Sequence, residues 1–304
     1  HKAIRRQRQM CIRDRYKITF DKSRGCIKSI WDKMNKRELV DPNAKDGFGS
    51  YVYERYDKKQ SLQYLKEYIY DDYKKSHYCI TGKSTYLDDH TKGVHEAARR
   101  MELYVEDHKS SIQAILVPSI SIGEEKHTSG MKVILYENMP YIDIKLSVVN
   151  KPATEEPEAG WIALPFQTKE PVYRIGRLGS VIDPAKDLIE GSQFNYIWSN
   201  SGLMIKDKDY SIGICALDAP AVQLGDLNFM HFADKYENPQ SHLYFNLFNN
   251  RWNTNFTSFW NGNLTTEVRL WVNQPSADDA LGLVVPAWET RLPLQAVSYT
   301  HLRA

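Results

Sequence analysis

The chain has 304 residues, a formal net charge of +2 and an aromatic content of 12%, and this length allows one large domain or two small ones. No run of about 18 apolar residues occurs, which excludes a transmembrane helix. Once Cys11 is set aside, Cys26, Cys79 and Cys215 are far apart and form no CxxC pair. They favour buried free thiols, and hence a reducing compartment such as the cytoplasm, over a disulfide framework or a zinc site.

The two ends differ in composition from the rest of the chain. Residues 1–15 hold six basic residues and one acidic residue, and residues 297–304 follow none of the patterns before them. Both segments, with the strings MCIRDR and VSYTHLRA, resemble translated sequencing-adapter fragments, so we leave them out of the fold prediction. The alternative is a basic tail that binds nucleic acid or a membrane surface. Without these ends the chain is acidic, which removes the support for a polyanionic partner such as nucleic acid.

Short strands separated by turn residues dominate residues 16–296, which we treat as one domain. Residues 16–20 and 26–31 alternate in polarity. The DKSRG segment between them offers Asp21 to open a turn and Gly25 for a positive φ, so a hairpin is predicted. A second hairpin joins residues 132–136 to residues 141–149. Further strands are expected at residues 111–117, 161–166, 203–205, 211–216, 242–248 and 265–272.

Few segments have helical spacing. Ser61 is a possible N-cap, followed by Leu62, Leu65 and Ile69 at i, i+3 and i+7. A second short helix is expected from Ser276 through residue 281, and residues 286–294 would begin another set of strands. Many turn-connected strands with one or two short helices predict an all-β fold, a large antiparallel two-sheet supersandwich.

The usual catalytic motifs are absent. The sequence has no Gly-rich phosphate loop, no GxSxG and no HExxH. His90 and His95 lie in a turn-rich segment, where exposed loop histidines are favoured over metal ligands. Adjacent acidic residues such as Asp88 and Asp89 do not face each other across a glycosidic bond, as the carboxylates of glycosidases do. We therefore assign no catalytic residue and no metal ligand.

One segment favours sugar binding. Asn249, Arg251, Trp252, Asn253 and Asn255 fall within a stretch of seven residues. An indole ring can stack on the apolar face of a pyranose while amides and a guanidinium bind its hydroxyls. The alternative is an ordered loop whose Asn side chains satisfy backbone groups.

Five further sequence stretches are informative because of the order in which they occur along the chain. They read YKITFD…GCIKSIWDK…RELVD at residues 16–41, VILYENMPYIDIK at 133–145, EAGWIALPF at 158–166, DAP at 218–220 and LFNNRWNTNF at 247–256. In this order they resemble the C-terminal sandwich of family 38 glycoside hydrolases, the α-mannosidases. Residues 151–157, KPATEEP, depart from the family's pattern at that point, which leaves the glycoside open.

The resemblance implies a supersandwich of the galactose-mutarotase type. In that family an N-terminal α/β domain and a helical bundle hold a divalent metal, usually zinc, and the Asp nucleophile of a retaining hydrolase. No position of this chain matches those motifs. The resemblance thus implies that the parent enzyme hydrolyses α-mannosides, that this chain alone is inactive, and that its partners are the missing catalytic domain and a glycan.

Two other functions stay open. The chain could be a free-standing carbohydrate-binding or structural β-sandwich module. It could also be a mutarotase- or lyase-like enzyme, which would need a histidine and a carboxylate converging in a cleft. His77, His231 and His242 are the histidines whose positions test the second possibility.

Overall fold

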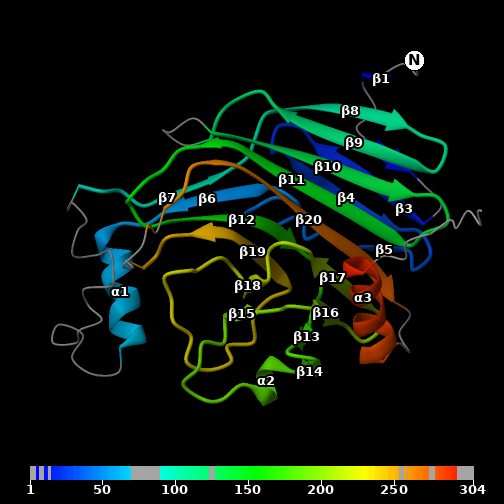
Figure 1. Cartoon of the computed structure of the whole chain (residues 1–304). Coiled ribbons are helices and arrows are strands. Elements are labelled where there is room, and N and C mark those ends of the chain that lie inside the picture. Colours follow the sequence, from blue (N-terminus) through cyan, green and yellow to red (C-terminus); the bar gives the residue numbers. More distant parts are fainter. Residues whose placement is uncertain are drawn as a thin grey trace, which may run out of the picture.

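In the computed structural model the chain forms two packed layers of antiparallel strands and few helices (Figure 1). The structure describes residues 5–6, 10–12, 15–69, 90–122, 127–252, 257, 259–273 and 278–292. One layer is a single ten-stranded sheet, and the other consists of a six-stranded and a four-stranded sheet.

The ten-stranded sheet forms one whole layer, and β20 lies near its middle. Its strands, in spatial order, are β1 (Arg5–Arg6), β8 (Met101–Asp107), β9 (Ser111–Pro118), β10 (Thr128–Tyr136), β11 (Tyr141–Lys151), β20 (Gly262–Asn273), β17 (Ser211–Ala216), β16 (Gly202–Lys206), β13 (Val172–Arg177) and β14 (Ser180–Ile182). Every pairing in it is antiparallel, so hairpins and longer loops suffice to connect its strands.

The opposite layer is divided. Its six-stranded sheet has the order β15 (Tyr196–Trp198), β18 (Ala221–Leu224), β19 (His242–Asn249), β12 (Glu158–Pro165), β6 (Tyr51–Arg55) and β7 (Val94–Ala97). Its four-stranded sheet has the order β2 (Met10–Ile12), β3 (Tyr16–Asp21), β4 (Cys26–Asp32) and β5 (Arg37–Glu38). Single bridges from Ile27 to Phe48 and from Val40 to Phe166 connect the two sheets.

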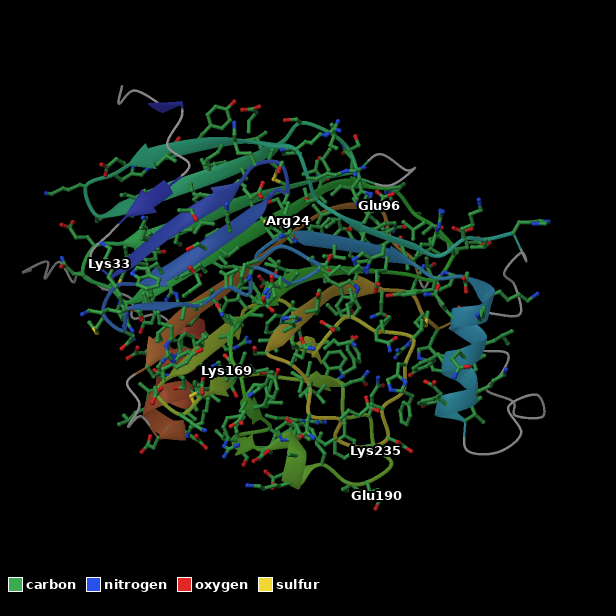
Figure 2. All side chains as sticks on the ribbon, turned by 180° about the vertical axis from the view of Figure 1, so that it is seen from behind. Arg24, Lys33, Glu96, Lys169, Glu190 and Lys235 are labelled. Carbon is green, nitrogen blue, oxygen red and sulfur yellow. The ribbon has the colours of Figure 1, made fainter. Side chains whose placement is uncertain are left out.

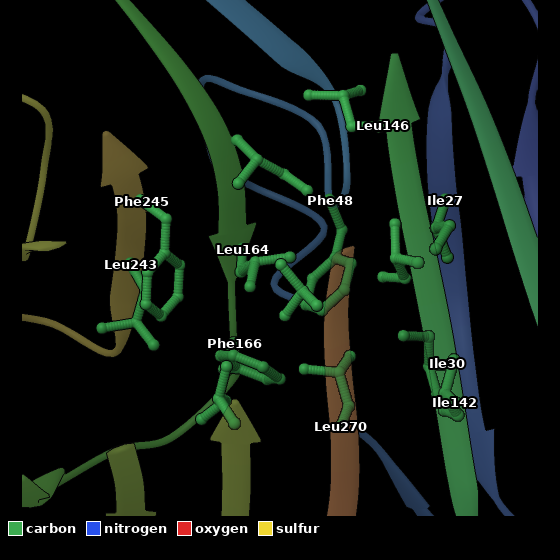
Figure 3. Packing of buried hydrophobic residues seen from close by; sticks show 14 of the residues in the cluster. Ile27, Ile30, Phe48, Ile142, Leu146, Leu164, Phe166, Leu243, Phe245 and Leu270 are labelled. Carbon is green, nitrogen blue, oxygen red and sulfur yellow. The ribbon is translucent and has the colours of Figure 1, made fainter. Parts of the chain in front are cut away.

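The main core lies between the two layers. Alternate residues of β3 are buried, as expected for a strand with one face on a core. Figure 3 shows Ile27 and Ile30 of β4, Ile142 and Leu146 of β11, and Leu164 of β12 pointing into the same apolar space. Each such side chain, when fully buried, stabilises the fold by about 1.5–3 kcal/mol.

Strand β12 is buried on both faces. Ile162 and Leu164 face the main core, whereas Trp161 and Ala163 belong to a second cluster on the outer face of the six-stranded sheet. Phe229, from the loop between β18 and β19, covers Trp161 with a ring-centroid distance of 5.0 Å. This outer cluster carries the segment that the sequence identifies as a sugar-binding candidate.

The helices differ from the prediction in their boundaries. Helix α1 (Lys58–Tyr68) has its N-cap at Asp57, four residues before Ser61, because Asp57 and Gln60 form a capping box. Ser61 is therefore not the N-cap but a buried residue inside the helix. Short α2 (Pro184–Asp187) was not expected.

The C-terminal described segment is helical where strands were predicted. A π-helical turn, η3 (Ala280–Val284), continues into α3 (Val285–Arg291). The prediction of strands from residue 286 is wrong, because Pro286 lies in the first turn of α3, where the φ that its ring fixes already suits a helix. The second short helix was thus expected in the right region, and Ser276 itself lies outside the described residues.

All the strands predicted between residues 16 and 272 are present. The hairpins β3–β4 and β10–β11 form as expected, and Gly25 has the predicted positive φ of 60°. The all-β antiparallel supersandwich is confirmed, with its second layer split in two. Residues Arg5–Arg6 pair with β8 and Met10–Ile12 pair with β3, while Arg15 donates a 2.7 Å hydrogen bond to the Val272 carbonyl. The domain boundary at residue 16 stays a prediction.

Two further sequence expectations concern cysteines and membrane spans. Cys26 and Cys215 are buried free thiols, and Cys79 lies outside the described residues. Burial raises the pKa of Cys26 to about 11, so this thiol stays protonated and unreactive at neutral pH. Within the described residues, every helix is too short or too polar to cross a bilayer.

Candidate functional site

The segment that follows β19 begins with two asparagines in different roles. Asn249 is exposed, and its Nδ2 donates a 2.7 Å hydrogen bond to Oδ1 of Asn246. Asn250 is buried: its Oδ1 accepts from the Glu158 N–H at 2.6 Å, and its Nδ2 donates to the Thr154 carbonyl at 2.9 Å. Asn250 thus satisfies backbone groups, as the ordered-loop alternative requires, whereas Asn249 keeps an exposed amide at the surface.

Arg251 lies between aromatic rings. Its guanidinium carbon is 4.0 Å from the ring centroid of Tyr64 and 4.1 Å from that of Phe229. Its Nη1 donates a 2.9 Å hydrogen bond to the Phe229 carbonyl. Burial lowers the pKa of Arg251, while the neighbouring tyrosine hydroxyls act in the opposite direction. Cation–π contacts of this kind connect helix α1, the β18–β19 loop and the segment after β19.

Trp252 packs edge-on against helix α1. Its ring centroid is 5.7 Å from that of Tyr64 and 5.2 Å from that of Tyr68. Tyr64 and Tyr68 are four residues apart, so they share one face of α1 and stack on each other at 5.7 Å. Phe232 completes the group, 5.5 Å from Tyr68. We call Tyr64, Tyr68, Phe232 and Trp252 the aromatic corner.

The aromatic corner combines an apolar surface with polar neighbours. Tyr68 is 46% exposed, and Asn249 is also exposed. Of the five predicted sugar-binding residues, the structure brings Arg251 and Trp252 into one cluster and places Asn249 at the end of the adjoining strand. Asn253 and Asn255 lie outside the described residues. The sequence did not indicate Tyr64 and Tyr68, although their i, i+4 spacing was visible.

His95, on edge strand β7, sits between two carboxylates. Its Nε2 is 2.9 Å from Asp46 Oδ1, and its Nδ1 is 3.0 Å from Glu54 Oε1. Burial alone would lower the pKa of His95, but the hydrogen bonds to Asp46 and Glu54 outweigh it and raise that pKa to about 9. Tyr244 and Tyr56 donate hydrogen bonds to the same two carboxylates. At neutral pH His95 is an imidazolium ion that joins β7 to the loop before β6.

This histidine site does not fit a metal. Both imidazole nitrogens of His95 already bind carboxylates, so neither is directed at a shared ion. Among the residues that the structure describes, no three His, Cys, Asp or Glu side chains converge as metal ligands would. The described residues thus offer zinc no ligand set.

Two more histidines bear on the mutarotase- or lyase-like alternative. His231 Nδ1 is 3.0 Å from Glu67, and its Nε2 is 3.4 Å from Glu237. His242 is buried, with Nδ1 at 2.8 Å from Asp226 and Nε2 at 3.0 Å from Asp41. Both nitrogens of each ring thus lie within ion-pair distance of a carboxylate. His77 lies outside the described residues.

Comparisons with known proteins agree with this architecture. No family model and no curated protein matches the sequence. An α-mannosidase from Enterococcus faecalis V583 superposes with a TM-score of 0.59 at 9% identity, over 94% of this chain and 31% of that chain. A glycosyl hydrolase family 38 protein from Enterococcus faecalis gives 0.56 at 9% identity, over 94% and 32%.

A smaller protein also matches. A galactose mutarotase-like protein from Lactobacillus casei ATCC 334 gives a TM-score of 0.43 at 10% identity, over 87% of this chain and 99% of that chain. The present chain spans about a third of the length of the two Enterococcus faecalis proteins. At such low identity the likeness to those two proteins concerns the fold, and the fold they share with this chain is the β-sandwich described above.

Proposed function

We propose that this chain is the sandwich portion of a glycoside hydrolase similar to the family 38 α-mannosidases. The observation that carries the proposal is the alignment of 94% of the chain with 31% of the Enterococcus faecalis α-mannosidase. The ordered set of sequence segments between residues 16 and 256 adds independent support. The remaining part of such an enzyme would supply the divalent metal and the carboxylates for retaining hydrolysis of an α-mannoside.

An exposed apolar stripe supports a larger parent protein. On η3 and α3, four apolar side chains occur at spacings of four, three and four residues: Leu281 is 67% exposed, Val285 44%, Trp288 53% and Leu292 63%. The opposite face of this helix is buried through Leu283 and Ala287. We assign the rest of the same enzyme as the occupant of this stripe, because the aligned mannosidase contains about twice as much additional chain.

The aromatic corner is the proposed wall of the substrate cleft. Asn249, Arg251, Trp252, Asn253 and Asn255 are the proposed glycan contacts, with Trp252 beside the pyranose ring and Asn249 on its hydroxyls. Arg251 is held by Tyr64 and Phe229, so besides its proposed glycan contact it would position Trp252 and the backbone of the segment.

The test compares two proteins that share this sequence. Long reads of the parent DNA across both ends should reveal an upstream reading frame with metal-ligand and nucleophile motifs. The longer protein should hydrolyse an aryl α-mannoside, and the 304-residue chain should not, with or without added zinc. Turnover by the 304-residue chain, or a parent frame with no upstream domain, would overturn the proposal.

A free-standing carbohydrate-binding module is the second proposed function, and the aromatic corner is the observation that favours it. In that case the 304-residue chain should bind methyl α-mannoside in a calorimetric titration, and Trp252→Ala should abolish the signal. Binding that is absent at millimolar concentrations would contradict this second function without affecting the first.

A further inference from the structure

A separate cavity of about 290 Å³ lies beyond the six-stranded sheet. Residues 194–195, just before β15, form one side of it, and residues 223–240, from the end of β18 through the loop that leads to β19, form the other. Figure 2 shows Lys235 on this loop, next to Glu190 of the neighbouring segment. A volume of this size is at the lower end of the range for small-molecule sites.

The backbone holds the cavity open. The Phe194 N–H donates to the Ala233 carbonyl at 2.9 Å, and the Leu224 N–H donates to the Asn195 carbonyl at 2.8 Å. Gly225 has a φ of 80°, and a Cβ there would lie 3.0 Å from Pro239. The two walls are thus joined by hydrogen bonds and by a turn that suits glycine, so the cavity exists before any ligand binds.

Polar side chains that the fold does not use surround this cavity. Asn228, Lys235 and Asn238 are exposed, and their side chains make no hydrogen bond or ion pair with the residues that the structure describes. Gln223 is 1% exposed, and its Nε2 donates to the Asp226 carbonyl at 3.1 Å. Its Oε1 is buried without a donor among the described residues. Gln223 therefore forms part of the buried base of the wall, and the exposed amides of Asn228 and Asn238 are the groups that a ligand can reach.

The remaining lining determines the kind of ligand. Tyr236 is half-buried and Phe194 is buried, which gives the cavity an aromatic side. Asp226 and Glu237 are acidic, whereas Lys235 is basic, so the charges are mixed and favour neither a phosphate nor a cation. Amides that can bind paired hydroxyls, together with an aromatic ring, match a neutral pyranose.

We propose that this cavity binds one neutral pyranose unit, with Tyr236 against the sugar ring and Asn228, Lys235 and Asn238 on its hydroxyls. The proposal goes beyond the proposed function, because binding here requires only residues of this chain. A few hydrogen bonds and one ring contact should give a dissociation constant of about 1 mM.

The experiment is a calorimetric or NMR titration of the 304-residue chain with the methyl α-pyranosides of mannose, glucose and galactose. Asn228→Ala, Lys235→Ala and Tyr236→Ala should each weaken binding at least fivefold. Asn43→Ala and Lys28→Ala, which change exposed residues of the same types outside the cavity, should leave binding unchanged. Circular dichroism checks folding, and Lys235→Ala alters only an exposed side chain.

Three outcomes would overturn the inference. One is that none of the three sugars binds at 50 mM. Another is that binding survives every cavity variant. The third is that binding is lost in Trp252→Ala and kept in Lys235→Ala, which would place the sugar at the aromatic corner. None of these outcomes bears on hydrolysis by a longer parent enzyme, so the failure of this inference and of the proposed function can be distinguished.

Discussion

Lys151 and Glu158 form an ion pair with 0% and 2% of their side chains exposed. The second carboxylate oxygen of Glu158 accepts a 2.9 Å hydrogen bond from the Tyr53 hydroxyl. The Lys151 ammonium also lies 5.2 Å from the ring centroid of Phe248. A pair removed from water to this degree holds only while both partners and their hydrogen bonds remain, because the cost of burying each charge is large.

Replacing one partner should therefore destabilise the fold severely. Lys151→Met leaves the Glu158 carboxylate buried without its cation, and the free energy of unfolding should fall by about 3–5 kcal/mol. Lys145→Met is the matched control, because the Lys145–Glu267 pair is 40% and 24% exposed and should contribute under about 1 kcal/mol. Guanidinium denaturation measures the loss in the free energy of unfolding for both variants. Equal losses for the two variants would contradict this account of Lys151.

Deprotonation of His95 should lower the stability of the fold at alkaline pH. Its folded-state pKa of about 9 lies above the ordinary value of 6.5. Its contribution is therefore fully present below about pH 6.5 and is lost as the pH rises through 9. The contribution of His95 to the free energy of unfolding should be about 2–3 kcal/mol larger at pH 6.5 than at pH 10. Urea melts of wild type and His95→Gln should converge at pH 10. His108→Gln changes a 46% exposed side chain and serves as the control. If its stability differed from that of the wild type with the same pH dependence as His95→Gln, a specific role of His95 would be contradicted.

The capping box should stabilise the aromatic corner. Asp57→Ala removes the acceptor for the Gln60 N–H and should cost about 1 kcal/mol in the free energy of unfolding. Because α1 carries Tyr64 and Tyr68, near-ultraviolet circular dichroism of Trp252 and its neighbours should weaken as the helix frays. Asp57→Asn, which can still cap, should keep both the stability and the spectrum. An unchanged spectrum in Asp57→Ala would show that α1 is held by packing alone.

The apolar stripe on η3 and α3 should make the 304-residue chain self-associate. Leu281→Lys together with Trp288→Gln should lower the apparent mass in light scattering at high concentration, because both side chains are more than half exposed. Met139→Gln changes an exposed apolar side chain elsewhere and serves as the control. Wild-type protein that stays monomeric at high concentration would contradict this role and favour an independent domain.

The sequence predicts the strands well because their signals are local. Alternation in residues 141–149 and the turn glycine at position 25 depend on neighbours along the chain, and the structure contains both features. The helix start was misplaced because Asp57 and Gln60 form a stronger cap than Ser61 does. The second layer is split into two sheets that only the single Ile27–Phe48 and Val40–Phe166 bridges join, and no local pattern encodes these long-range pairings.

The candidate sites depend even more on distant contacts. Asn249–Trp252 stands out in the sequence, but the partners of Arg251 come from residues 64 and 229. The pyranose cavity forms only because residues 194 and 233 meet through a backbone hydrogen bond. The abundance of Asn, Asp and Gln between residues 223 and 240 is the only sequence signal for it, and such a composition is equally typical of a solvated loop.

The place of β20 has a consequence for synthesis on the ribosome. Residues 262–273 fill the gap between β11 and β17, so until they emerge both strands keep one edge unpaired. Open edges of this kind are sites where nascent chains pair with each other. A stalled or shortened product that ends before residue 262 should therefore depend on chaperones far more than the finished chain does, although among the described elements it lacks one strand and the helical segment after it.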